Sequence, residues 1–95
     1  MDRRLTILIV VLAFSLSLSG CCYFAAKNEI KAAEQSFSEL KGAGGATKVP
    51  YEYCSAETFL GMSKMEFNQS DYREAKKFAT QSKSASTAGL AGVKK

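Results

Sequence analysis

The chain has 95 residues, with 13 lysines and arginines against 9 aspartates and glutamates, and it contains no histidine, no tryptophan, one proline and three cysteines. This length allows one domain at most. The lack of histidine removes the side chain that most often acts as a general base at neutral pH. A chain that is 46% hydrophobic and 23% charged also differs from a disordered acidic or basic tail. We therefore expect a small folded protein that is not an enzyme.

The first 20 residues have the pattern of an export signal. Arg3 and Arg4 precede a stretch from Leu5 to Leu18 in which 11 of 14 residues are apolar. A helix of that length spans about 21 Å, which is short of the roughly 30 Å hydrocarbon core of a bilayer. The pattern predicts a cleaved signal peptide over residues 1–20 rather than a lasting transmembrane helix.

The end of this stretch resembles the lipobox of bacterial lipoproteins. A leucine, two small residues and a cysteine follow one another as Leu18, Ser19, Gly20 and Cys21. The resemblance implies that a signal peptidase recognises the first three residues and cleaves before Cys21. The thiol of Cys21 would then carry diacylglycerol, and its amino group an N-acyl chain such as palmitate. Several acyl chains give stable membrane anchoring while the polypeptide stays in water, and we expect no other cofactor.

The resemblance also implies a location. In Gram-negative lipoproteins an aspartate directly after the lipidated cysteine favours retention in the inner membrane, and this chain has Cys22 there. The outer membrane, facing the periplasm, is therefore expected if the organism is Gram-negative. The net charge of +4 suggests anionic lipid headgroups or cell-wall polymers as partners of an exported protein, and we expect no nucleic-acid partner.

The remaining cysteines, Cys22 and Cys54, leave three outcomes open. In an oxidising periplasm they can form a disulfide that closes a loop of about 33 residues. The alternatives are a second acyl group on Cys22 or free thiols. Because the chain has no CxxC motif and no histidine, we expect no metal site.

The residues after the cysteines predict an all-α fold of three packed helices following the signal helix. Segment 21–49 holds an amphipathic helix over 26–41, a glycine-rich stop at 42–45 and an extended linker. Pro50 begins a second helix. Asp71 begins a third as its N-cap, with Glu74 three residues later. Few large apolar residues occur over 85–95, and we expect a flexible basic tail there.

Segment 50–84 resembles a single tetratricopeptide-repeat (TPR) hairpin. The resemblance is carried by Asn68-Gln69-Ser70-Asp71-Tyr72-Arg73-Glu74-Ala75, a polar turn followed by Asp-Tyr and an alanine. It implies that small residues lie where the two helices cross and larger ones at the flanks. The residues that it assigns to packing include Phe59, Met62, Ser63, Tyr72 and Ala75, and the helical spacing of the third helix adds Phe78 and Ala79. Two departures from the family are a glutamate, Glu66, at an aromatic position and the absence of a proline after the second helix.

The stretch from Pro50 to Glu57, reading Pro-Tyr-Glu-Tyr-Cys-Ser-Ala-Glu, is similar to one found in a class of small, alanine-rich bacterial envelope lipoproteins. In that class it lies between a helix after the lipidated cysteine and a TPR-like hairpin. The similarity agrees with the lipobox on the location of the protein. It carries no activity with it.

These features predict a membrane-anchored, non-catalytic lipoprotein that acts as a small helical adaptor or structural component. About eight large apolar side chains make a marginal core, so an envelope protein, the cell wall or a second copy would complete the fold. Tyr51 and Tyr53 beside Pro50 are candidate partner contacts, and the alternative is that they pack under the first helix. The alternative function is a membrane-active lysis or toxin lipoprotein. The glutamates that alternate with lysines on helix 26–41 argue against it.

Overall fold

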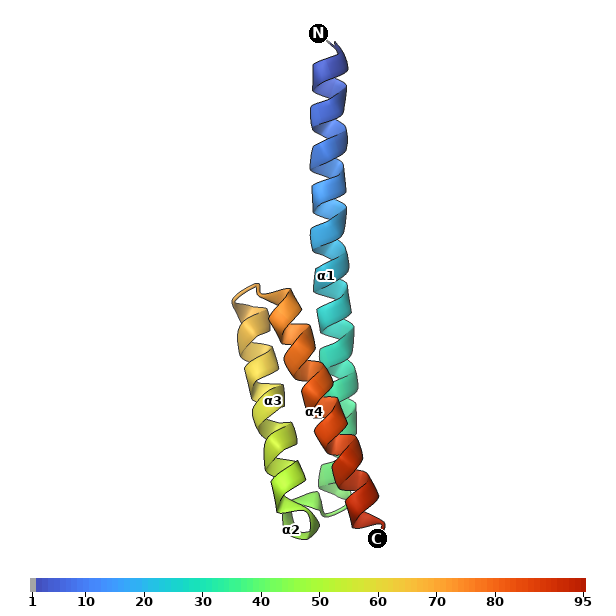
Figure 1. Cartoon of the computed structure of the whole chain (residues 1–95), viewed down its shortest axis with the longest axis vertical. Helices are drawn as coiled ribbons and strands as arrows, with labels where there is room; N and C mark the ends of the chain where they lie inside the picture. Colours follow the sequence, from blue (N-terminus) through green and yellow to red (C-terminus); the bar gives the residue numbers. More distant parts are fainter. Residues whose placement is uncertain (1) are drawn as a thin grey trace.

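The computed structural model describes residues 2–95, including the side chains of all these residues except 15–21. Regular structure in this part of the chain is entirely helical, which confirms the predicted class. The helices are α1 (Asp2–Gly42), α2 (Gly45–Lys48), α3 (Pro50–Asn68) and α4 (Tyr72–Val93). The molecule is elongated, with extents of 68 × 20 × 14 Å. Figure 1 shows why: the first half of α1 extends beyond the other helices.

Helix α1 is one continuous helix of 41 residues. The sequence predicted a helix that begins near Ala26, and this boundary is wrong. Proline is absent from α1, and Gly20 is the sole glycine before Gly42, so no strong helix breaker interrupts it. The second half of α1 packs beside α3 and α4 (Figure 1). The same helix therefore joins the apolar N-terminal segment directly to the packed unit.

The glycine-rich stop after α1 is confirmed. Gly44 has φ of +82°, a left-handed conformation that glycine adopts without steric cost. The extended linker expected over residues 47–50 is wrong in part, because Gly45–Lys48 form the short helix α2. Only Val49 leaves helical geometry, with φ −135° and ψ 67°, because the residue before a proline is disfavoured in the helical region. Pro50 then starts α3, as predicted.

The turn between α3 and α4 also follows the sequence pattern. The carboxylate of Asp71 accepts a hydrogen bond of 3.3 Å from the backbone N–H of Glu74. This bond satisfies one of the free N–H groups at the start of α4. The predicted N-cap is therefore confirmed, and it fixes the point at which α4 leaves the turn.

The predicted flexible tail over residues 85–95 is wrong. Helix α4 continues to Val93, and Ser86 and Gly89 within it are buried. The prediction failed because it took the lack of large apolar side chains over residues 85–95 as a sign of flexibility. The buried residues of α4 are instead small and recur every three or four positions, namely Ala75, Ala79, Ser82, Ser86 and Gly89. Small residues bury the helix backbone itself by allowing neighbouring helices to come close.

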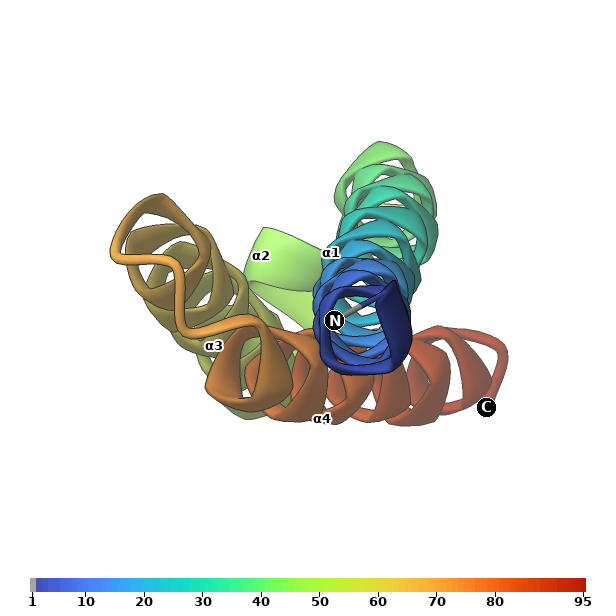
Figure 2. The ribbon, with the colours of Figure 1, turned by 90° about the horizontal axis from the view of Figure 1, so that it is seen from above.

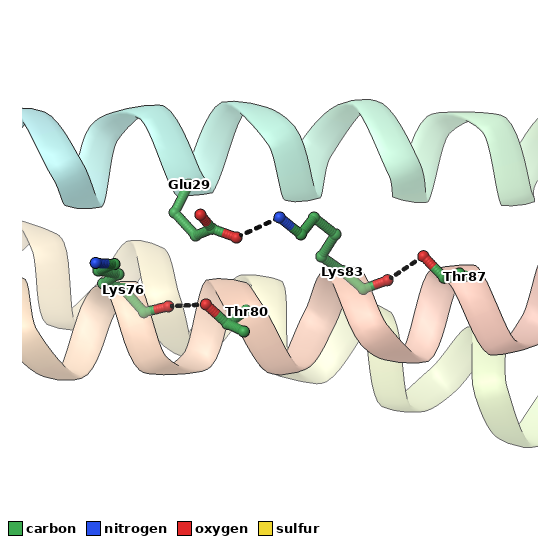
Figure 3. A network of polar contacts seen from close by, with 5 residues as sticks. All are labelled: Glu29, Lys76, Thr80, Lys83 and Thr87. Atoms are coloured by element: carbon green, nitrogen blue, oxygen red, sulfur yellow. Dashed lines mark hydrogen bonds and ion pairs between the residues drawn. The ribbon is translucent and has the colours of Figure 1, made fainter.

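Helix α4 holds the unit together. It packs along both α1 and α3, which touch each other much less. Figure 2 shows α4 along one side of the unit, with α1 and α3 both lying against it and apart from each other. The core lies at these contacts and contains Ala26, Ile30, Ala33, Leu60, Ala75 and Ala79. An ion pair of 2.7 Å between Lys83 Nζ and Glu29 Oε1 also joins α4 to α1 at the surface (Figure 3).

Candidate functional site

The residues of the predicted lipobox, Leu18, Ser19 and Gly20, and the predicted lipidation residue Cys21 belong to helix α1, and their side chains fall outside the described part of the structure. The segment before them is described. Its large apolar side chains between Leu5 and Phe14 are 58% to 66% exposed. A continuous apolar surface of this kind usually marks a place where a protein meets a membrane or a partner. A membrane-spanning helix is not found among the described residues, since no apolar stretch there is long enough.

The crossing of α3 and α4 brings together two residues that the sequence predicted. Ser63 and Ala75 are both fully buried, and the Ser63 hydroxyl donates a hydrogen bond of 2.6 Å to the Ala75 carbonyl oxygen. A second bond of 2.7 Å runs from the Ser82 hydroxyl to the Ala56 carbonyl oxygen. The pattern of small residues predicted the close approach. The same pattern did not predict the two hydrogen bonds.

The flanks of this crossing are aromatic. The rings of Phe59 and Phe78 stack with centroids 6.4 Å apart, and Ala79 is fully buried beside them in α4. Met62 is half-buried. Next to the turn of the hairpin, the ring centroids of Tyr72 and Phe67 lie 5.3 Å apart. The structure thus places all seven predicted packing residues in or beside the α3–α4 hairpin.

Tyr23 on α1 is a packing residue that the sequence pattern did not reveal. Its ring centroid lies 5.2 Å from that of Phe67 and 5.4 Å from that of Tyr72. The contact ties α1 to the turn between α3 and α4. Sequence spacing predicted the inward face of α1 only from Ala26 onward, although Tyr23 lies three residues earlier on that same face.

The two tyrosines beside Pro50 have different surroundings. The Tyr53 ring packs against Phe37 of α1 with centroids 5.0 Å apart, which matches the alternative of packing under the first helix. Tyr51 is 80% exposed, and it borders a shallow hollow on α3 that Cys54 and Phe59 also line. Of the two tyrosines, Tyr51 is therefore the one open to a partner.

Of the outcomes that the sequence left open for Cys22 and Cys54, the disulfide is not formed, and both thiols are free and exposed. Cys22 precedes Tyr23, which packs against Phe67 near the end of α3. Cys54 lies in the first turns of α3, and the 13 residues from there to Phe67 rise about 20 Å along a helix. Disulfides join residues whose Cα atoms are less than about 7 Å apart. The fold therefore keeps these cysteines at opposite ends of the hairpin.

A groove of about 330 Å³ lies between α1 and α3. Its lining combines three lysines with an apolar floor and consists of Lys27, Ile30, Lys31, Glu34, Lys64, Phe67 and Asn68. Lys64 Nζ forms an ion pair of 2.9 Å with Glu34 Oε1 across the groove. Lys27 Nζ lies 5.9 Å from the centroid of the Tyr23 ring, a cation–π distance. The groove forms because α1 and α3 both pack along α4 and contact each other much less. Its residues come from two separate helices, so no continuous segment of the sequence predicts it.

Metal-binding chemistry finds no support in the described part of the chain. No group of three or more histidine, cysteine, aspartate or glutamate side chains there is arranged to hold a metal ion. Comparisons with protein-family models, curated proteins and solved structures find no match to this chain. Three features of the molecule therefore stand as candidates for function: the exposed apolar segment before Leu18-Ser19-Gly20-Cys21, the surface around Tyr51, and the lysine groove.

Proposed function

We propose that this protein is a lipid-anchored component of the bacterial cell envelope that holds a small, non-catalytic helical unit at a membrane surface. The proposal is carried by one combination: the exposed apolar segment from Leu5 to Phe14 leads directly into Leu18-Ser19-Gly20-Cys21. Each large apolar side chain gains about 1.5–3 kcal/mol when it is fully removed from water. A lone helix that exposes a run of them is suited to a membrane or to the export machinery.

The place of the anchor fits the shape of the molecule. Helix α1 continues from the lipobox into the packed unit without a break, so the unit would stand immediately beside the membrane. Cys22 rather than aspartate after the anchor favours the outer membrane of a Gram-negative cell, with the unit in the periplasm.

The packed unit would act as an adaptor built on a TPR-like hairpin. Support comes from the fully buried pair Ser63 and Ala75 at the crossing of α3 and α4, which matches the small positions of that family. A single TPR hairpin cannot bury its face alone, and here α1 packs along α4 in the place of a neighbouring repeat. Tyr51, exposed at the start of α3, is the proposed contact for an envelope protein or the cell wall.

The anchor is tested by comparing two adjacent cysteines. The full chain is expressed in a bacterial host, and the intact mass of the product is measured with its membrane fractionation. We expect a chain that begins at Cys21 and carries diacylglycerol and an acyl group. Cys21→Ala should accumulate as the uncleaved precursor, whereas Cys22→Ala should be processed normally. If the wild type and both variants all had the mass of their unlipidated chains, the proposal would be rejected.

The adaptor role needs a separate test. A photo-crosslinking amino acid is placed at Tyr51 and, as a control, at Lys77, which is exposed on α4. We expect one discrete crosslinked envelope component from position 51 and none from position 77. No product, or the same products from both positions, would count against an adaptor. Growth arrest on expression of Cys21→Ala would favour the membrane-active alternative instead.

A further inference from the structure

The groove between α1 and α3 carries positive charge that the protein does not neutralise. Lys27 and Lys31 are exposed on α1, and neither forms an ion pair with any described residue. Lys64, on the α3 side of the groove, already forms an ion pair with Glu34. Three lysines against one glutamate leave an excess of positive charge in one hollow. The site therefore favours an anion.

The floor of the groove is apolar. Ile30 is buried at its base and Phe67 is half-buried on the α3 side. An apolar floor beneath lysine ammonium groups suits a ligand with an anionic group next to a hydrocarbon portion. A free inorganic anion would leave this floor unused.

The groove lies at the end of the unit from which the exposed apolar part of α1 extends (Figure 1). Lys27 follows Cys21 by six residues, which is about 9 Å along a helix. This distance is similar to the Debye length of about 8 Å at physiological ionic strength, within which charges attract anionic lipids. Lys27 would therefore lie within reach of the membrane that the proposed anchor occupies, and Lys31, ten residues or about 15 Å from Cys21, would reach it when α1 tilts toward the membrane.

We propose that this groove binds the anionic headgroup of a membrane phospholipid. The phosphate would lie between the ammonium groups of Lys27 and Lys31, and the glycerol and first methylenes would lie on Ile30 and Phe67. Residues four apart on a helix are neighbours on its surface, so one phosphate reaches both lysines. Lysine is a compact cation that binds phosphate well. The inference rests on the proposed membrane anchoring and adds a specific lipid contact to it.

The chain contains its own control for non-specific attraction. Lys76 and Lys77 are exposed on α4. Helices α1 and α4 run side by side in the same direction, with Tyr23 beside Tyr72 and Leu40 beside Gly89. Lys76 is therefore at the level of Lys27 along the molecule but outside the groove lining. A general attraction to an anionic surface would act on both pairs, whereas a groove site acts on one.

The experiment is lysine footprinting in nanodiscs. The processed protein is reconstituted in discs of phosphatidylcholine alone or with a third of phosphatidylglycerol, and acetylation rates of individual lysines are measured by mass spectrometry. Anionic lipid should slow acetylation of Lys27 and Lys31 about fivefold each, the factor for one favourable lysine contact. Lys76 and Lys77 should change by less than about twofold. Equal protection of both pairs, or none at Lys27 and Lys31, would overturn the proposal.

Variants give a second, independent result. Lys27→Ala/Lys31→Ala should reduce the enrichment of phosphatidylglycerol over phosphatidylcholine among the lipids that co-purify with the protein about 25-fold, the product of two such contacts, whereas Lys76→Ala/Lys77→Ala should change it far less. All four lysines are on exposed helix surface, so folding should be retained, and circular dichroism checks this. The intact mass separately reports the lipid on Cys21. A lipidated protein without groove protection would reject the groove alone, and a protein without lipid would reject the anchor.

Discussion

The hydroxyl of Ser63 on α3 donates a hydrogen bond to the carbonyl oxygen of Ala75 on α4 across 2.6 Å, at a point where both residues are fully buried. Ser82 on α4 donates in the opposite direction to Ala56 on α3 across 2.7 Å. Each carbonyl has two lone pairs, so it accepts this bond in addition to one within its own helix. Because sliding α3 along α4 would break both bonds together, the pair fixes the register of the hairpin.

Replacing Ser63 tests this register. Ser63→Ala should lower the free energy of unfolding by about 1 kcal/mol, the net value of a typical hydrogen bond. Ser63→Leu should cost about 1–3 kcal/mol through overpacking, because there is no space at the helix crossing. Urea unfolding followed by circular dichroism measures both. Ser84→Ala, at an exposed position of α4, should change stability by less than about 0.5 kcal/mol. If all three variants matched the wild type, the crossing would not carry the stability assigned to it.

Gly89 and Gly61 should respond in opposite ways to the same substitution. A Cβ atom at Gly89 would lie 2.9 Å from Leu40 Cδ1 and 3.2 Å from Glu52 Cβ. Leu40 cannot move aside easily, since it is fully buried and also fills the space against Gly45. Gly89→Ala should therefore destabilise the protein by about 1–3 kcal/mol.

Gly61 lies on the exposed side of α3, and a methyl group added there would meet no described atom within 4 Å apart from its chain neighbours and the backbone of its own helix. Nothing therefore opposes the higher helix propensity of alanine, and Gly61→Ala should stabilise the protein by up to about 1 kcal/mol. Thermal unfolding of the two variants side by side measures the difference. Stabilisation by both substitutions would contradict the tight contact between Leu40 and Gly89.

Ser86 and Ser82 provide a contrast within one helix. Both are fully buried in α4, but the Ser86 hydroxyl has no hydrogen-bond partner among the described residues, whereas the Ser82 hydroxyl donates to the Ala56 carbonyl oxygen. Leaving a buried polar group unpaired costs about 1–3 kcal/mol. Ser86→Ala should therefore stabilise the fold by about 1 kcal/mol, and Ser82→Ala should destabilise it by about the same amount. Chemical denaturation of both single variants tests this. Destabilisation by Ser86→Ala would show that its hydroxyl has a partner in solution.

Shortening the chain tests whether the end of α4 is structural. A chain that stops after Ser84 loses Ser86 and Gly89 and uncovers Leu40. Exposing one fully buried leucine costs about 1.5–3 kcal/mol, so the truncated chain should have a clearly lower unfolding midpoint. A chain that stops after Val93 is the control and should keep the full stability. Equal midpoints for both chains would restore the flexible tail that the sequence predicted.

The sequence predicted most local features correctly because their causes are local. Pro50 at the start of α3, the Asp71 cap on α4 and the glycine stop at Gly44 each depend on backbone preferences within a few residues. The TPR resemblance predicted a helix crossing at the small residues Ser63 and Ala75, because it paired a position in one helix with a position in the other.

The prediction failed where the decisive neighbour is distant in sequence. Residues 85–95 contain little that is apolar, and only Leu40, on a different helix, shows why Gly89 must be small. A disulfide between Cys22 and Cys54 was allowed by composition and excluded by the length of α3. Tyr51 and Tyr53 cannot be distinguished from their positions in the sequence. In the structure, the Tyr53 ring packs against Phe37 and Tyr51 is exposed.

The sequence by itself determined the helical class, the end of α1, the starts of α3 and α4 and the apolar segment near the N-terminus, because each is specified by a continuous run of residues. The tertiary structure alone decided that α1 and α3 both pack along α4, and this placement creates the lysine groove between them. Lys27 and Lys64 come from helices that share no local signal. They line one hollow because the small side chains of α4 let it pack closely against both helices at once.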